Sequence, residues 1–215
     1  MKATSYRHVF WDVDTQADFM LTGGKLYAPG AETIILNLER LTQHARKRRL
    51  LVVASADAHR PDDPEFSQWP PHCLVGNPGQ RKIEQTSLAP CYVVVADPTQ
   101  LPDDLSGFRQ IVVEKRSVDV FDNPNLEAVL ARLGKPEVTV YGVVTEVCVR
   151  LAAQGLLSRG YHVRIVSDGI RALSKEAGEQ ALTQLSAQGA RLVSTDQVVG
   201  VNGHKDPHPQ SAPGR

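Results

Sequence analysis

The sequence predicts a single α/β domain, a three-layer αβα sandwich around a mostly parallel sheet of about six strands. Apolar segments rich in β-branched residues alternate with amphipathic helical segments, which is the pattern of repeated βαβ units. The 215 residues, 41% of them hydrophobic, are enough to bury the core of such a domain. Lys and Arg together number 24, as do Asp and Glu. This balance excludes a strong overall attraction to nucleic acid or membrane and favours a small neutral or zwitterionic ligand.

The first half of the chain contains two predicted strands and one helix. Residues 8–13 form an apolar strand, and residues 50–55 are so apolar that both faces of that strand must be covered. Between them, residues 32–47 form a helix whose apolar positions are spaced by three and four. These positions are Ile34, Ile35, Leu38, Leu41 and Ala45. The Pro-rich polar stretch 57–90 is too long for an ordinary connection, which indicates a functional excursion.

The second half continues the alternation. Strands are predicted at 92–96, where the strand is short and accessory, and at 110–114, 138–143, 162–167 and 191–194; helices are predicted at 125–133, 146–159 and 175–188. Gly160 and Gly189 end the last two helices. With right-handed crossovers, the carboxyl ends of the strands should meet at one edge and build the site. We assign residues 1–200 to this domain and 201–215, rich in Pro, Gly and His, to a flexible C-terminal tail.

The apolar runs and the cysteines of the sequence indicate where the protein is located in the cell. No apolar run approaches the roughly 20 residues that a membrane helix needs, and the first residues lack the apolar core of a signal peptide. We therefore expect a cytoplasmic protein. The three cysteines, Cys73, Cys91 and Cys148, are an odd number without a C-x-x-C spacing. This argues against a disulfide framework and against a cysteine-rich zinc module.

Four polar residues fall at or just beyond the carboxyl ends of predicted strands: Asp14, Asp57, Lys115 and Cys148. Cys148 would lie in the first turn of a helix with Thr145 as N-cap, where free N–H groups and the positive dipole end favour a thiolate. A carboxylate, an ammonium and a thiol are the groups that cysteine-based acyl transfer needs. Taken singly, each has a structural explanation: a buried cysteine, a capping Asp14, a solvated Lys115.

The excursion carries residues suited to a metal ion. Asp57 and His59 are two apart, so they point the same way on extended backbone, and Glu65 and His72 follow on the loop. Two imidazoles and two carboxylates suit Zn²⁺, Mn²⁺ or Fe²⁺. By residue type alone, solvated side chains explain the same pattern.

Three motifs together resemble the isochorismatase-like cysteine hydrolases. They are Asp14-Thr-Gln16-Ala-Asp18-Phe19, the pair Glu114-Lys115 after a strand, and Gly142-Val-Val-Thr145-Glu146-Val-Cys148-Val149, in the family's order. The resemblance implies a Rossmann-like fold and a catalytic triad of Asp14, Lys115 and Cys148. It also implies an oxyanion hole from the backbone N–H groups of Val144 and Cys148, shaped by a cis peptide between Val143 and Val144.

Within that family, the excursion is similar to that of nicotinamidases, since Asp57-Ala-His59 is followed by Trp69-Pro70-Pro71-His72-Cys73. This resemblance implies one divalent metal ion on Asp57, His59, Glu65 and His72, with Zn²⁺ the first expectation and Mn²⁺ or Fe²⁺ as alternatives. It also implies that the ion anchors a pyridine nitrogen while Phe19 and Trp69 hold the ring; at Phe19, core packing explains the residue almost as well.

Two residues depart from the nicotinamidase pattern. Glu65 stands where many nicotinamidases have a third histidine, and Val147 stands where several have a histidine before the nucleophile. Glutamate can still coordinate, but it changes the preference for the metal. Val147 removes a polar contact from the pocket, which allows a different or wider range of substrates.

The resemblance leads us to expect a nicotinamidase that hydrolyses nicotinamide to nicotinate and ammonia through a cysteine thioester, in NAD salvage and pyridine nucleotide biosynthesis. We also expect a homo-oligomer. The alternative is a related cysteine amidohydrolase or an isochorismatase-type hydrolase acting on another small substrate. A third interpretation uses Asp12-Val-Asp14, which resembles the nucleophile motif of haloacid-dehalogenase phosphatases, although Gln16 stands where that motif has a hydroxyl residue. A non-catalytic binding module on the same fold is the remaining alternative.

Overall fold

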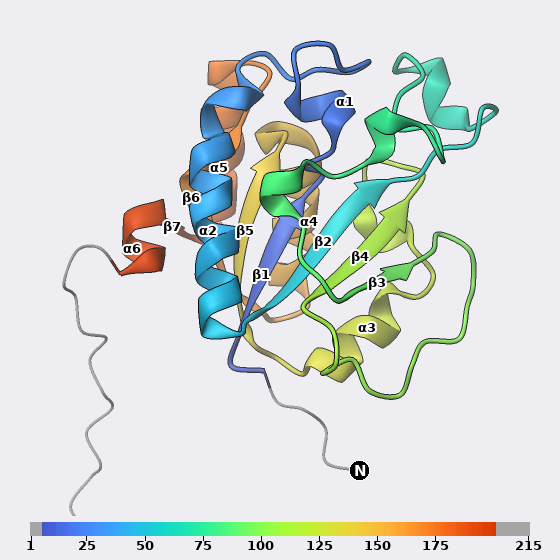
Figure 1. The fold of residues 1–215 in the computed structure, drawn as a ribbon. Coiled ribbons are helices and arrows are strands. Elements are labelled where there is room, and N and C mark those ends of the chain that lie inside the picture. The colour runs from blue at the N-terminus through green and yellow to red at the C-terminus, as the bar shows by residue number, and fades with distance from the viewer. Residues whose placement is uncertain (1–5, 201–215) are drawn as a thin grey trace, which may run out of the picture.

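The computed structural model describes residues 6–200, and their strands form one parallel seven-stranded sheet in the order β3-β4-β2-β1-β5-β6-β7 (Figure 1). The strands are β1 His8–Val13, β2 Leu51–Asp57, β3 Cys91–Val94, β4 Gln110–Lys115, β5 Glu137–Val143, β6 His162–Arg171 and β7 Arg191–Val193. The predicted fold class is confirmed, and all seven predicted strand segments join the sheet, so the count is seven rather than about six. The predicted tail 201–215 lies outside the described residues.

The helices are α1 Ala17–Met20, α2 Ile35–Arg48, α3 Leu126–Leu133, α4 Arg150–Ser158, α5 Lys175–Ala187 and α6 Thr195–Val199. The sequence analysis did not predict α1 and α6, which are only four and five residues long. The predicted helix 32–47 is divided, because a 3₁₀ turn at Ala31–Ile34 precedes α2. Within the described part of the chain, no helix is long and apolar enough to cross a membrane.

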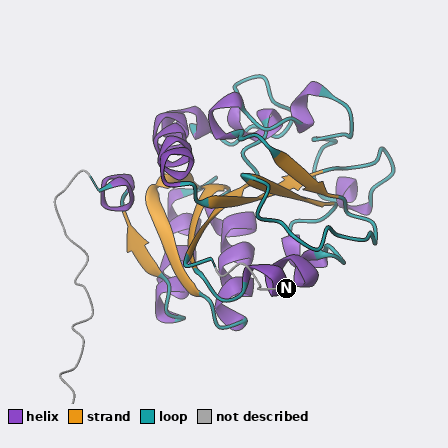
Figure 2. Cartoon of the chain, turned by 60° about the horizontal axis from the view of Figure 1, so that its bottom comes forward, coloured by secondary structure: helices purple, strands orange, loops and turns teal. Residues whose placement is uncertain are grey.

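Helices cover both faces of the twisted sheet (Figure 2). One core contains buried side chains of α3, α4 and α5, and the other contains those of α2 together with residues of the excursion. Strand β1 divides its side chains accordingly: Trp11 and Val13 enter the first core and Phe10 enters the second. This alternation is the period of two that a strand covered on both faces requires.

Strand β6 is longer than predicted, since it continues past Ser167 to Arg171. Its pairing with β5 shifts between Val140 and Gly142, which marks a bulge. The polar residues Ser167 and Asp168 are exposed there, whereas Ile170 is buried again. The prediction ended the strand early because a bulge interrupts the apolar alternation without ending the strand.

The excursion after β2 lies over the carboxyl edge of the sheet, near α1 (Figure 1). It contains three short 3₁₀ turns, at Pro64–Ser67, Pro78–Gln80 and Glu84–Thr86. Lys82 fixes it to β1, because its Nζ lies 2.5 Å from Asp12 Oδ2 and 2.7 Å from Thr15 Oγ1. Asp12, the first aspartate of the phosphatase-like motif, is thus engaged in a structural ion pair.

We predict that Leu38→Ala lowers the free energy of unfolding by about 2–5 kcal/mol, because it leaves a cavity where a fully buried side chain packs. Leu36→Ala on the same helix is the matched control, since Leu36 is 68% exposed. Urea unfolding of the two variants measures the difference. Equal effects would contradict the assignment of the inward face of α2.

Candidate active site

The four strand-end residues of the sequence analysis meet at one edge of the sheet. Asp57 and Lys115 are register partners at the ends of β2 and β4. Asp14 follows β1 directly, and Cys148 lies five residues beyond the end of β5. Because parallel strands end at the same edge, residues from four separate segments come within contact distance.

The ammonium of Lys115 is the centre of this group and is fully buried. Its Nζ lies 3.0 Å from Asp14 Oδ2, donates a hydrogen bond to Asp57 Oδ1, and lies 3.8 Å from Cys148 Sγ. Burial would lower the pKa of Lys115, but the two carboxylates outweigh burial and hold this pKa well above its ordinary value. The lysine is therefore charged.

Asp14 is buried beside this ammonium, and its backbone has a left-handed φ of 50° that turns the chain away from β1. Ser55 Oγ donates a hydrogen bond of 2.7 Å to Asp14 Oδ1. Burial and the neighbouring Asp57 charge raise the pKa of the Asp14 carboxyl, although Lys115 and Ser55 act in the opposite direction. A carboxylate with a raised pKa is better suited to accept and return a proton.

Cys148 lies on a single π-helical turn, Thr145–Val149, that precedes α4. The prediction that Thr145 caps an α-helix is wrong: Val144 occupies the cap position, and its carbonyl accepts the N–H groups of Val147 and Val149 at 3.2 and 3.1 Å. The turn begins where β5 passes very close to β1. A Cβ at Gly142, whose φ is 120°, would lie 2.1 Å from the Val13 carbonyl oxygen, which explains the glycine of this motif.

The surroundings of Cys148 act against the thiolate that the sequence analysis expects. Burial raises the pKa of the Cys148 thiol well above its ordinary value, and the Asp14 and Asp57 charges add to this although Lys115 opposes it. Cys148 is half-buried and lines the cavity, where its thiol lies near two carboxylates. A raised pKa favours the thiol, so attack by this sulfur calls for a base that removes its proton.

The four predicted metal ligands also come together. One donor atom from each of Asp57, His59, Glu65 and His72 lies within 4.8 Å of the others. The Nε2 atom of His72 lies 3.2 Å from Asp57 Oδ2 and 3.8 Å from Glu65 Oε1. The Nε2 atom of His59 lies 3.6 and 3.7 Å from the same two oxygens. Two imidazoles and two carboxylates thus face one point.

These four residues fit a divalent cation. The Nε2 atom of His59 is buried and has no hydrogen-bond partner among the described residues. Burial opposes ionisation of Asp57, but Lys115 and the neighbouring imidazoles hold its pKa well below the usual range. Burial, reinforced by the charge of Asp57, raises the pKa of Glu65. A cation at the centre of the group would neutralise both carboxylates and accept the free imidazole lone pair.

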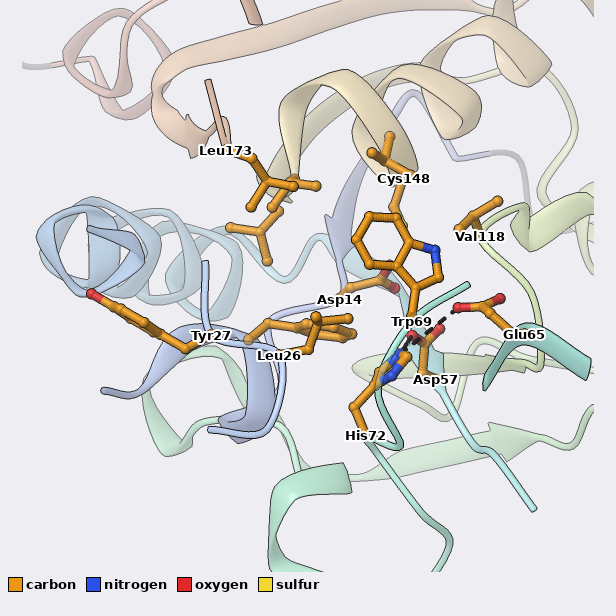
Figure 3. A pocket seen from close by; sticks show the side chains of 14 residues that line it. Asp14, Leu26, Tyr27, Asp57, Glu65, Trp69, His72, Val118, Cys148 and Leu173 are labelled. Carbon is orange, nitrogen blue, oxygen red and sulfur yellow. Dashed lines mark hydrogen bonds and ion pairs between the residues drawn. The ribbon is translucent and has the colours of Figure 1, made fainter. Parts of the chain in front are cut away.

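One cavity of about 110 Å³ joins the two groups (Figure 3). A single water needs only about 10–15 Å³ on this measure, so the cavity has room for a small molecule. Its lining includes Asp14, Phe19, Asp57, Glu65, Trp69, His72, Val144 and Cys148. The sequence analysis missed an apolar side of the wall, formed by Leu26, Tyr27, Val118 and Leu173. These four come from loops whose sequences carry no motif.

Aromatic residues lie beside the quartet. Phe19 is buried in the second core, and its ring centroid is 5.3 Å from that of His72, so it serves both core packing and the cavity wall. Trp69 lines the cavity from the excursion. Phe66, which the sequence analysis did not single out, packs 5.0 Å from His59.

The remaining predicted features are the cis peptide, the oxyanion hole and the two other cysteines. The Val143–Val144 peptide is cis, as the resemblance implies. Val144 and Cys148 both line the cavity, and their role as oxyanion donors stays a prediction. Cys73 is buried and Cys91 is exposed, and neither lines the cavity.

Gln16 is a structural residue that the motif contained without an assigned role. Its fully buried amide accepts the Asp57 N–H at 2.7 Å and donates to the Asp57 carbonyl at 2.8 Å. It also donates to the Gln80 carbonyl at 2.6 Å. The side chain thereby takes the place of a neighbouring strand where β1 has already ended, and it fixes Asp57 to the excursion.

Asp18 fixes the excursion at a second point. Its Oδ2 accepts the Cys73 N–H at 2.7 Å, directly after His72, and its Oδ1 accepts the Lys25 N–H at 3.0 Å. A Cβ on Gly79 would lie 2.2 Å from the Asp18 carboxyl, so the excursion packs tightly against this side chain. The segment after β1 therefore positions both Asp57 and His72.

Comparison with known proteins agrees with the motifs. The family model described as Isochorismatase domain matches residues 12–197. The nicotinamidase of Escherichia coli (strain K12) is 26% identical over 209 residues, covering 84% of this chain and 91% of its own length. The pyrazinamidase of Pyrococcus horikoshii in complex with zinc has a TM-score of 0.72 at 25% identity, over 88% of this chain and 99% of that one. The N-carbamoylsarcosine amidase of Thermoplasma acidophilum has a TM-score of 0.72 at 25% identity, over 89% and 98%.

We predict that Gln16→Ala destabilises the protein, because it leaves the buried N–H and carbonyl groups of Asp57 without hydrogen-bond partners. Each such group costs about 1–3 kcal/mol, so the free energy of unfolding should fall by at least about 2 kcal/mol. Chemical denaturation measures the change, with Gln68→Ala on the exposed part of the excursion as the control. A loss no larger than that of the control would show that the three hydrogen bonds contribute little.

Proposed function

The chain belongs to the isochorismatase family of hydrolases, and we propose that it is a metal-dependent nicotinamidase, which hydrolyses nicotinamide to nicotinate and ammonia. The observation that carries the proposal is one cavity lined by members of two groups: Asp14 and Cys148 of the triad with Lys115, and Asp57, Glu65 and His72 of the quartet with His59. An enzyme for a pyridine carboxamide needs both groups, one for the amide and one for the ring nitrogen. The product would enter NAD salvage.

The amide chemistry follows from the positions of the charged groups. Asp14 takes the proton of the Cys148 thiol as the sulfur attacks the carboxamide carbon. The carbonyl oxygen becomes an oxyanion and accepts hydrogen bonds from the backbone N–H groups of Val144 and Cys148, each worth about 10²- to 10³-fold in rate. Lys115 remains protonated throughout and limits the build-up of negative charge beside Asp14.

The tetrahedral intermediate then collapses. The C–N bond breaks while Asp14 returns its proton to the departing nitrogen, which leaves as ammonia, and a nicotinoyl thioester remains on Cys148. Asp14, again a carboxylate, takes a proton from the attacking water. The C–S bond breaks, Cys148 recovers its proton from Asp14, and the acid loses its carboxyl proton to solvent and leaves as nicotinate. Both half-reactions use the same carboxyl group, whose raised pKa suits the exchange.

The quartet serves to hold and orient the ring. Asp57, His59, Glu65 and His72 would hold one divalent ion, which when bound supplies an electron-pair acceptor for the pyridine nitrogen. A related pyrazinamidase was crystallised with zinc, which supports Zn²⁺ as the first choice, with Mn²⁺ and Fe²⁺ as alternatives. Phe19 and Trp69 flank the ring in this proposal, and holding the amide over the thiol removes much of the entropic cost of encounter.

A second candidate is hydrolysis of another small amide by the same triad. Val147 and the apolar side of the cavity favour it, because they line the cavity with carbon rather than with groups that would bind one particular amide by hydrogen bonds. The likeness to an N-carbamoylsarcosine amidase shows that this fold also carries amidases with other substrates. The homo-oligomer expected from the sequence stays a prediction.

We predict that the protein loaded with Zn²⁺ releases ammonia from nicotinamide and that Cys148→Ala lowers this rate by several orders of magnitude, because the nucleophile is lost. Cys91→Ala, which removes an exposed thiol, is the control and should retain the rate. An active Cys148→Ala variant would exclude Cys148 as nucleophile. If the metal-loaded wild type released no ammonia from nicotinamide, the result would instead favour the second candidate.

We also predict that His59→Ala reduces bound metal from stoichiometric to trace amounts after dialysis, because it removes one of four ligands. Elemental analysis of the dialysed protein measures this. His162→Ala removes an exposed histidine of β6 and should leave the metal content unchanged. Full metal retention in His59→Ala would contradict the ligand assignment.

A further inference from the structure

The two histidines of the quartet are held by different partners. The Nδ1 atom of His59 lies 3.0 Å from the carboxylate oxygen Oδ2 of Asp63, whereas the Nδ1 atom of His72 lies 2.8 Å from the carbonyl of Pro70. Each Nε2 faces the carboxylates of the quartet, 3.2 Å from Asp57 Oδ2 for His72 and 3.6 Å for His59. An ion bound by the Nε2 atoms would therefore place the proton of each imidazole on Nδ1, where both partners can accept it. The two Nδ1 partners differ in charge, because Asp63 is a carboxylate and the Pro70 carbonyl is neutral.

The side chain of Asp63 is committed to His59. Asp63 is the cap residue of the 3₁₀ turn Pro64–Ser67, yet its carboxylate does not cap that turn. Instead, Oδ2 accepts the backbone N–H of Arg60 at 2.9 Å as well as the imidazole N–H. The His59 side chain is fully buried, and that of Asp63 is 9% exposed. Solvent therefore competes little for this hydrogen bond.

The same turn connects Asp63 to a second ligand. Pro64 restricts the backbone of Asp63 to the extended region, and its φ and ψ are −62° and 135°. Glu65 follows two residues later and points its carboxylate into the quartet. One short turn thus supplies a ligand and the support for another, which fixes their relative positions.

We propose that Asp63 is a positioning residue of the metal site: it holds His59 in the tautomer that presents Nε2 to the ion, and its negative charge strengthens that nitrogen as a donor. This inference rests on the proposed function, because it takes the quartet as the metal site. A carboxylate behind a ligating histidine is a general device for fixing the ring and raising its basicity. His59 should therefore be the stronger of the two imidazole donors.

The test is the Zn²⁺ dissociation constant of the full chain, stripped of metal and titrated in competition with a chromophoric chelator. Asp63→Ala should weaken binding by about 10- to 100-fold. Asp63→Asn should weaken it by an intermediate factor, because its amide oxygen still accepts both N–H groups but carries no charge. Asp62→Asn, which removes the neighbouring exposed charge, is the control and should bind like the wild type.

The melting temperatures of the metal-free proteins separate positioning from folding. Asp63→Asn should melt with the wild type in the metal-free state and differ only in zinc affinity. Wild-type affinity in both Asp63 variants would overturn the proposal, and so would wild-type affinity in Asp63→Asn alone, since charge would then play no part. Failure of the wild-type protein itself to bind zinc would overturn the proposed metal site and the role of Asp63 with it.

Discussion

The buried ammonium of Lys115 is the interaction on which the rest of the site depends. Removing a charged group from water costs several kcal/mol unless partners compensate for it, and here Asp14 and Asp57 do so from the two neighbouring strand ends. The two carboxylates stabilise the buried ammonium of Lys115, and this ammonium in turn stabilises the ionised forms of Asp14 and Asp57. Because Asp57 also belongs to the quartet, this one cation links the group that would cleave the amide to the group that would hold the ring.

The position of Asp57 beside Lys115 also explains why the segment after β1 carries the buried polar side chains Gln16 and Asp18. Once Asp14 has turned the chain out of the sheet, pairing with β1 can no longer support Asp57, the last residue of β2. Gln16 replaces that pairing with side-chain hydrogen bonds to Asp57, and Asp18 holds the backbone beside His72. The excursion has little secondary structure of its own, so its geometry is fixed by buried polar contacts rather than by a helix or strand.

Much of this architecture could be predicted from the sequence, because it depends on local periodicity. Strand β1 has the predicted bounds, and Asp14, Lys115 and Cys148 meet because parallel strands end at one edge. The helix α6 could have been found from its capping box, in which Ser194 and Gln197 satisfy each other's backbone. The π turn at Thr145, the raised pKa of Cys148, the apolar wall with Leu26 and the contact of Asp63 with His59 could not. They depend on burial and on hydrogen bonds between segments that only the folded chain brings together.

The two groups of the site differ in how they are distributed along the chain. Asp14, Lys115 and Cys148 stand on three separate segments, so changing their arrangement would require the sheet itself to change. Of the quartet, His59, Glu65 and His72 lie on one excursion over a sheet edge, and Asp57 is the last residue of the strand that precedes it. Evolution could therefore exchange the ring anchor by replacing a single loop while the hydrolytic machinery stays in place. Asp57 is the exception, because it contacts Lys115 and also belongs to the quartet. Its replacement would disturb both groups.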